Sequence, residues 1–166
     1  MDKSIKLLNM NKIEELRKDS KLTERGRLHY ELHRSHNEVV QKIIISLNES
    51  TYIAPHYHNE KAESFILLSG NIDILIFDKK GCITDIYNMN EEGLIYIEIP
   101  NNIIHTLRCN LPSVILEIKE GPFNVNNAKE FPTWSVLEED LVISNPYKLL
   151  KVGHDYSNKI NMGNYD

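Results

Sequence analysis

The chain has little cysteine, no long apolar run and no block of like charge. Its 166 residues include two cysteines, Cys82 and Cys109, which form no CxxC pair. Two such thiols exclude a disulfide framework and indicate a reducing compartment. No stretch approaches membrane-spanning length, and the N-terminal run "MDKSIKLLNMNKIEELRKDS" is too charged for a secretory signal. We therefore expect a cytoplasmic protein without a membrane partner.

The charge balance also limits the partners. The net charge is −5, and basic residues are spread along the chain without forming a cluster. This pattern lacks the basic patch by which proteins bind nucleic acid, so we expect no nucleic-acid partner. With 41% apolar and 26% charged residues, the composition is that of an ordinary globular protein. The length suits one domain.

Hydrophobic periodicity predicts one short helix near the start. In "MNKIEELRKDSKL", Met10, Ile13 and Leu16 lie at helical spacing. Asn11 is a candidate cap because Glu14 follows three residues later. Charged residues cover the opposite side, so we expect this helix to pack on the outside of the core.

From residue 26 the period changes to two, which is typical of strands. The expected strands are "RLHYELH", "VVQKIIISLN", "STYIAPH", "ESFILLSG", "NIDILIFD", "CITDIYNM", "GLIYIEIP", "HTLRC" and "SVILEIKE". The residues Asp78 to Gly81 form a predicted hairpin turn, with glycine supplying the positive φ. Short strands recurring with turn residues between them indicate an all-β sandwich or barrel.

After Glu120 the composition shifts to turn-forming residues. We expect the run "GPFNVNNAKEFPTWSVLEED" to lie across the barrel as an ordered arm, anchored by Phe131 and Trp134. From about residue 141 the chain is polar and rich in asparagine, which predicts a tail that is mobile or ordered against a partner. The predicted division is a helical segment (1–25), a barrel (26–120) and an arm with tail (121–166), all within one domain.

The residues with metal-binding chemistry lie near two turns. In "PHYHNEKAESFILLSG", His56 and His58 are two apart, so they share a face of an extended segment, and Glu63 opens the next apolar run. His105 follows a Pro-Asn-Asn turn in "EIPNNIIHTLRC". If the strands close into a barrel, His105 can face the other three. Three imidazoles and a carboxylate suit one divalent Fe, Mn, Ni or Zn ion per chain, with open positions for a substrate.

These residues match the two motifs of the cupin superfamily. The first motif is matched by His56, His58, Glu63 and Gly70, with Ser50 in place of its leading glycine. The second is matched by Gly93, Pro100 and His105, with one extra residue before the proline. In this motif Asn102 stands where cupins have glycine. Asparagine can replace that glycine because it tolerates the left-handed conformation. Cys109 stands in place of the final asparagine.

Over roughly residues 5–137 the sequence resembles one branch, the WbuC-type cupin-fold metalloproteins, which are often linked with surface-polysaccharide (O-antigen) biosynthesis. The resemblance implies a double-stranded β-helix (a cupin or jelly-roll barrel), a bound divalent metal and a homodimer. It implies action on a small carbohydrate-derived metabolite, for which a Lewis-acid isomerase or epimerase is our leading hypothesis. An iron-dependent dioxygenase and a non-catalytic, metal-organised binding protein are the alternatives.

Several other side chains are candidates for binding substrate. Arg27 lies on the polar side of an early strand and Gln41 on the apolar side of the next, so the first can grip an anionic group and the second can orient a ligand. The plain alternatives are a solvated arginine and a core glutamine bonded to backbone. Further candidates with equally plain alternatives are the general bases His33 and His36, a Glu117–Lys119 pair in the pocket, and a pocket thiol at Cys109.

Overall fold

The structure of the chain is a computed structural model, which describes residues 5–125, 128–141 and 151–152. Its strands form one sheet in the order β1-β2-β6-β3-β4-β7, and β5 pairs with β3 beside this path. The strands are β1 (Arg27–Glu31), β2 (Val40–Leu47), β3 (Glu63–Phe77), β4 (Cys82–Asn90), β5 (Tyr96–Ile99), β6 (Ile104–Glu120) and β7 (Lys151–Val152). All pairs are antiparallel except β4 with β7. The prediction of an all-β fold is therefore confirmed.

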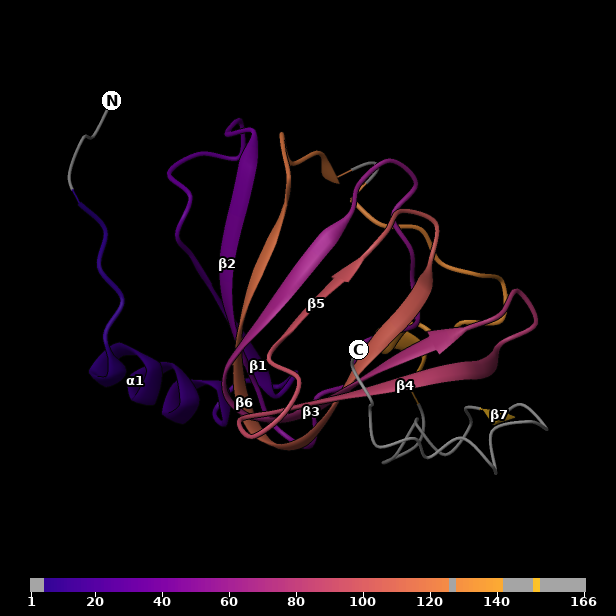
Figure 1. The fold of residues 1–166 in the computed structure, drawn as a ribbon, viewed down its shortest axis with the longest axis horizontal. Coiled ribbons are helices and arrows are strands. Elements are labelled where there is room, and N and C mark those ends of the chain that lie inside the picture. The colour runs from indigo at the N-terminus through magenta and orange to yellow at the C-terminus, as the bar shows by residue number, and fades with distance from the viewer. Residues whose placement is uncertain (1–4, 126–127, 142–150, 153–166) are drawn as a thin grey trace.

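Two long strands, β3 and β6, build both walls of the barrel. The sequence predicts two strands in each of these regions, but each region is one continuous strand of 15 or 17 residues. Their pairing shifts register between Leu67 and Ile72, where the sheet bends instead of ending. Gly70 lies within this bend with φ +100°. The bent sheet folds over on itself, and Figure 1 shows the two walls diverging from this bend.

The helix α1 (Met10–Ser20) covers the outer face of the sheet. Its Ile13 and Leu16 pack against Ile44 and Val114, as the apolar stripe predicts. The cap is Asn9 and not the predicted Asn11. Asn9 is extended, and its side chain accepts a hydrogen bond from the backbone N–H of Lys12. This satisfies a free donor of the first turn.

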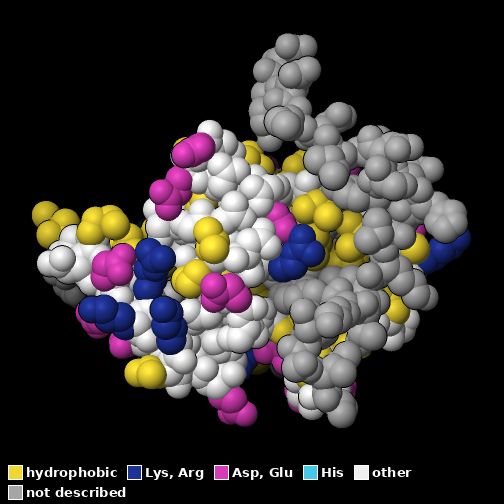
Figure 2. Space-filling view, turned by 90° about the horizontal axis from the view of Figure 1, so that it is seen from below, with side chains coloured by type: hydrophobic (Ala, Val, Ile, Leu, Met, Phe, Trp, Pro, Cys, Tyr) yellow, Lys and Arg dark blue, Asp and Glu magenta, His cyan; other side chains and the backbone are white. Residues whose placement is uncertain are grey.

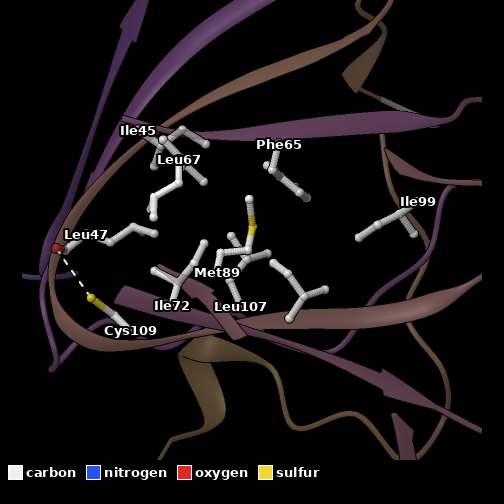
Figure 3. Close-up of a cluster of buried hydrophobic side chains, with 11 residues drawn as sticks. Ile45, Leu47, Phe65, Leu67, Ile72, Met89, Ile99, Leu107 and Cys109 are labelled. Atoms are coloured by element: carbon white, nitrogen blue, oxygen red, sulfur yellow. Dashed lines mark hydrogen bonds between the residues drawn. The ribbon is translucent and has the colours of Figure 1, made fainter. Parts of the chain in front are cut away.

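The main core lies between the two walls. Its buried members, drawn in Figure 3, come from β2, β3, β4, β5 and β6. Cys109 lies in this cluster, with its Sγ 3.5 Å from the carbonyl oxygen of Leu47. Burial raises the pKa of this thiol to about 11. Cys109 is therefore a buried core thiol, the plainer of the two predicted roles.

The turns and the arm follow the sequence prediction in part. Gly81 has φ +85°, and Asp78 accepts hydrogen bonds from the backbone N–H groups of Lys80 and Cys82. In the arm, Trp134 packs on Phe77 with ring centroids 5.3 Å apart. Phe131, the other predicted anchor, is 38% exposed, so it anchors the arm less fully.

The remaining features concern the chain end and the surface. Apart from 151–152, the predicted polar tail beyond residue 141 lies outside the described residues. Among the described residues, no helix is long and apolar enough to cross a membrane. Figure 2 shows acidic and basic side chains interspersed over the end of the molecule that α1 occupies, without a continuous basic band on this face.

Candidate metal centre

Hydrogen bonds between distant segments bring the predicted ligands to one end of the barrel. His56 forms an isolated antiparallel bridge with His105, in which each backbone N–H donates to the other residue's carbonyl at 3.0 and 2.9 Å. The backbone of Tyr57 bridges Glu130 of the arm in the same way. The segment around His56 is therefore held between the start of β6 and the arm. Glu63 is the first residue of β3.

The turn before β6 sets the position of His105. Asn102 has φ +63°, the left-handed conformation that the sequence predicts for an asparagine in place of glycine. Its backbone N–H donates to the carbonyl of His58 at 2.7 Å. This bond holds the turn against the segment that carries the first two histidines.

Four side chains converge as predicted. One ligand atom from each of His56, His58, Glu63 and His105 lies within 4.8 Å of the others, and all four residues are buried. His58 Nε2 is 3.1 Å from Glu63 Oε1, and His105 Nε2 is 2.5 Å from the same oxygen. The convergence depends on the pairing described above, because Glu63 and His105 are 42 residues apart in the chain.

Backbone carbonyls orient all three imidazoles. The Nδ1 atoms of His56, His105 and His58 lie 2.9, 2.9 and 2.6 Å from the carbonyl oxygens of Ala54, Ile103 and Ala128. A carbonyl only accepts, so each Nδ1 carries the proton and donates. In a neutral imidazole this leaves the Nε2 lone pair for a metal. The carbonyl of Ala128 in the arm is a contributor that no local sequence pattern predicts.

The electrostatics of the group fit a cation at its centre. Burial raises the pKa of Glu63, but the contacts with His105 and His58 outweigh it and hold this pKa well below its usual value. Burial lowers the pKa of His105, yet the neighbouring Glu63 carboxylate raises it overall. Burial lowers the pKa of His56, and His105 lowers it further. A carboxylate is thus ionised among imidazoles, and a proton on His105 or a metal ion balances its charge.

An orphaned atom gives a further test of the fit. His105 Nε2 is buried, forms no regular hydrogen bond with the described residues, and lies 2.5 Å from Glu63 Oε1. A metal ion bound by both atoms would satisfy the nitrogen and the carboxylate together. Three nitrogens and a carboxylate oxygen around one point form a donor set that first-row divalent ions prefer. The residues present therefore fit a metal ion.

A row of polar side chains leads from the metal centre across the inner wall. Glu63 pairs with Lys119 of β6, which pairs with Gln41 of β2, so these three residues point to the same side of the sheet. Glu117 forms an ion pair with Lys119, and only 10% and 20% of these two side chains is exposed. The pair is thus largely buried and not the surface ion pair of the plain alternative, and its place in a substrate pocket stays a prediction.

Gln41 is held by backbone. It is 2% exposed, and its Nε2 donates to the carbonyl of Glu38 at 2.7 Å, with longer bonds to those of His36 and Ser35. This is the core glutamine bonded to backbone that the sequence allowed as the plain alternative. Its predicted part in binding substrate stays a prediction.

Arg27 is paired with a carboxylate of the protein itself. Its guanidinium donates to both oxygens of Glu138, in the short helix η2 (Glu138–Asp140), at 2.7 and 2.8 Å, and to the carbonyl of Tyr52 at 2.8 Å. The Arg27 side chain is 5% exposed, so it is not the solvated arginine of the plain alternative. Glu138 lies 111 residues away from Arg27, and no sequence pattern predicts their contact. A role for Arg27 in binding substrate stays a prediction.

We expect Glu138→Gln to lower the free energy of unfolding by about 1–3 kcal/mol, because it leaves the buried Arg27 guanidinium without its counter-charge. Chemical denaturation measures this change. The control is Glu139→Gln, which alters an exposed neighbour in the same turn. Equal stability of the two variants would show that the pair contributes little.

Comparisons with known proteins agree with this fold. A family described as a domain of unknown function (DUF6016) matches residues 8–89. No curated protein matches the chain. Among solved structures, the capsular polysaccharide assembling protein CapF from Staphylococcus aureus is 19% identical with a TM-score of 0.52, over 66% of this chain and 32% of CapF. This chain therefore corresponds to about a third of CapF.

Two smaller proteins align over most of their own lengths. KdgF from Halomonas sp. is 10% identical with a TM-score of 0.50, over 63% of this chain and 87% of KdgF. The conserved protein SPY1581 of unknown function from Streptococcus pyogenes is 18% identical with a TM-score of 0.50, over 74% of this chain and 93% of that one. At such identities the likeness shows the fold alone. The fold is that of a cupin, a double-stranded β-helix, as predicted.

Proposed function

We propose that the chain is a metal-dependent cupin of the WbuC type, acting on a small carbohydrate-derived metabolite in surface-polysaccharide metabolism. One divalent ion is held by His56, His58, Glu63 and His105. The reaction is an isomerisation or epimerisation, in which a proton leaves a carbon next to a carbonyl and returns to the same or the adjacent carbon.

One observation carries the proposal. Three buried imidazoles, each with Nδ1 fixed by a backbone carbonyl, direct Nε2 toward one ionised carboxylate. Such preorientation is what a metal centre needs and what scattered histidines lack. Four protein ligands leave one or two positions open on an octahedral ion. When bound, the ion supplies Lewis-acid polarisation of a substrate oxygen.

The chain's own charges define the kind of substrate. Burial lowers the pKa of Lys119, but Glu117 and Glu63 raise it overall, so this side chain stays an ammonium. It lies opposite Glu63 on the inner wall. Glu117 already pairs with this ammonium, and its remaining N–H donors can bind a hydroxyl, carboxylate or phosphate oxygen of a substrate. The pair therefore favours a polar, oxygen-rich ligand such as a sugar derivative.

The association with polysaccharides has two supports. The first is the resemblance of the sequence to WbuC-type proteins. The second is the shared fold with CapF, described as a capsular polysaccharide assembling protein. Neither names a substrate, so the substrate class is tested directly.

The test is exchange of substrate hydrogen with solvent. Metal-loaded protein is incubated in D₂O with a panel of ketoses, uronic acids and nucleotide sugars, and NMR follows the proton next to the carbonyl. We expect deuterium to replace that proton in one class of sugar, and His56→Ala to abolish the exchange. Consumption of O₂ without exchange would favour the dioxygenase alternative. Tight binding with neither exchange nor turnover would favour the non-catalytic one.

Acid is expected to release the metal. Protons compete for the Nε2 lone pairs, so the bound form requires neutral imidazoles. The lowered pKa of His56 delays its protonation as the pH falls. We expect the metal to be retained at pH 7 and lost by about pH 4, as measured by dialysis and elemental analysis. Full retention at that lower pH would contradict a histidine-rich centre.

We also propose a homodimer, as the sequence resemblance implies, in the cytoplasm, as the two unpaired thiols and the charged N-terminal run suggest. The strand β1 lies at the end of the strand order, and the nearby N-terminal residues Ile5 and Leu7 are 86% and 81% exposed. A second copy would cover such an edge and such side chains. Light scattering coupled to gel filtration measures the mass, and a mass of 19.3 kDa, that of one chain, would refute the dimer.

A further inference from the structure

A second histidine–carboxylate group lies at the end of β1 and in the loop that joins β1 to β2. It consists of Glu31, His33 and His36, and it shares no residue with the metal centre described above. We propose that this group binds a second divalent transition-metal ion. This site is independent of the proposed function.

The distances between the three side chains suit a common ion. His36 Nε2 lies 3.1 Å from Glu31 Oε1, and His33 Nε2 lies 3.4 Å from Glu31 Oε2. The three ligand atoms lie within 4.8 Å of one another. Ligands bound at about 2.0–2.2 Å lie at such separations around one ion. No large movement of the backbone is needed to bring them to it.

His33 provides evidence beyond the clustering of polar groups. Its side chain is 1% exposed, and its Nε2 has no hydrogen-bond partner among the described residues. Its Nδ1 atom lies 3.1 Å from the carbonyl oxygen of Lys42, and the backbone N–H of Lys42 points to the same Nδ1 at 3.3 Å. A proton on Nδ1 donates to that carbonyl and leaves the Nε2 lone pair free on the side of Glu31. In that tautomer the buried Nε2 needs a partner other than the Glu31 carboxylate, which only accepts, and a bound cation supplies it.

The donor types select the kind of ion. Two imidazoles and a carboxylate favour zinc, nickel, copper or iron over magnesium and calcium, which prefer oxygen ligands. Glu31 and His36 have 53% and 56% of their side chains exposed, so water fills the remaining positions. The site is thus open to solvent on one side and closed by His33 on the other.

An ion at this site would restrain the loop between β1 and β2, which contacts Gln41 on the inner wall. The same loop supplies the carbonyls of Ser35, His36 and Glu38, which accept from the amide of Gln41. Gln41 in turn belongs to the row that ends at Glu63. Binding of the second ion would therefore hold the loop that positions Gln41, while making no direct contact with the first centre's ligands.

Zinc titration of the untagged, metal-free full chain tests the proposal. We expect two zinc ions per chain for the native protein and one for Glu31→Gln or His36→Ala, both of which alter exposed residues. His56→Ala is expected to lose the other ion and keep this one. Imidazole NMR signals of His33 and His36 are expected to shift as the second equivalent binds, and to stay in place in Glu31→Gln.

The matched control is Glu24→Gln, which removes an exposed carboxylate elsewhere on the surface. It is expected to bind as the native chain does. Binding of one zinc by the native chain, lost in His56→Ala, would overturn the second site and leave the first intact. Two ions in Glu31→Gln and in His36→Ala would also overturn it, because the second ion would then lie elsewhere.

Discussion

Replacing His56 by alanine is expected to weaken the tightest divalent-metal binding by more than about tenfold. Mutating a residue that only hydrogen-bonds to a metal ligand already lowers metal affinity by about tenfold or more, and this variant removes a ligand itself. The variant removes one of three buried imidazoles that each place a ligand atom within 4.8 Å of a Glu63 carboxylate oxygen. It also leaves the carboxylate ionised in a buried pocket with less compensation. Isothermal titration of the metal-free chain with zinc or manganese measures the change.

The matched control is Tyr57→Phe, between the two histidines in sequence. Tyr57 is not among the four converging residues, and its backbone bridge to Glu130 survives the substitution. We expect its affinity to equal that of the native chain. Unchanged affinity in His56→Ala would mean that the buried group is not the metal centre.

Gly70→Ala is expected to lower the free energy of unfolding by about 3 kcal/mol or more, adding backbone strain to overpacking. Gly70 has φ +100°. A Cβ added there would lie 2.3 Å from Ser113 Oγ and 2.8 Å from the carbonyl oxygen of Pro112. The backbone oxygen cannot move aside without breaking the bend between β3 and β6. Thermal or urea denaturation measures the loss.

Gly93→Ala is the control for this effect. Gly93 does not have a positive φ, and an added Cβ would lie 3.2 Å from the end of the Asn90 side chain, which can shift. We expect a change well below that of Gly70→Ala. Similar stability of the two variants would show that the bend tolerates a side chain.

The four candidate metal ligands could be predicted from the sequence because their spacing reflects local geometry. His56 and His58 share a face of an extended segment, and Asn102 adopts the left-handed turn that brings the chain back to His105. The alternation of apolar residues predicted the strands because it too reflects local backbone geometry. Where one strand ends and the next begins was less clear, because β3 and β6 bend through register shifts that leave the alternation interrupted.

The contacts made by the arm could not be predicted from the sequence. Glu138 meets Arg27 across 111 residues, and the carbonyl of Ala128 reaches His58 across 70. Neither contact leaves a periodic pattern, since one carboxylate or carbonyl in a turn-rich run resembles any other. The helix cap was missed for a smaller reason. Asn9 and Asn11 both suit a cap, and only the extended backbone of Asn9 distinguishes them.

The second histidine group shows another limit of sequence reasoning. His33 and His36 were candidates for a general base, with nothing to choose between them. The structure distinguishes the two, because His33 is buried with an Nε2 atom that lacks a hydrogen-bond partner among the described residues, and His36 is exposed. Burial of a polar residue depends on the packing of β2 against β1, which no short motif records.

The most direct measurement is the metal content of untagged protein purified without added metal, determined by elemental analysis. We predict at least one tightly held divalent ion per chain, lost in His56→Ala and retained in Tyr57→Phe. Iron would direct further work to oxygen chemistry, and zinc, manganese or nickel to sugar isomerisation. A chain that holds no metal, even after reconstitution with each of these ions, would contradict the central claim that His56, His58, Glu63 and His105 form a metal centre.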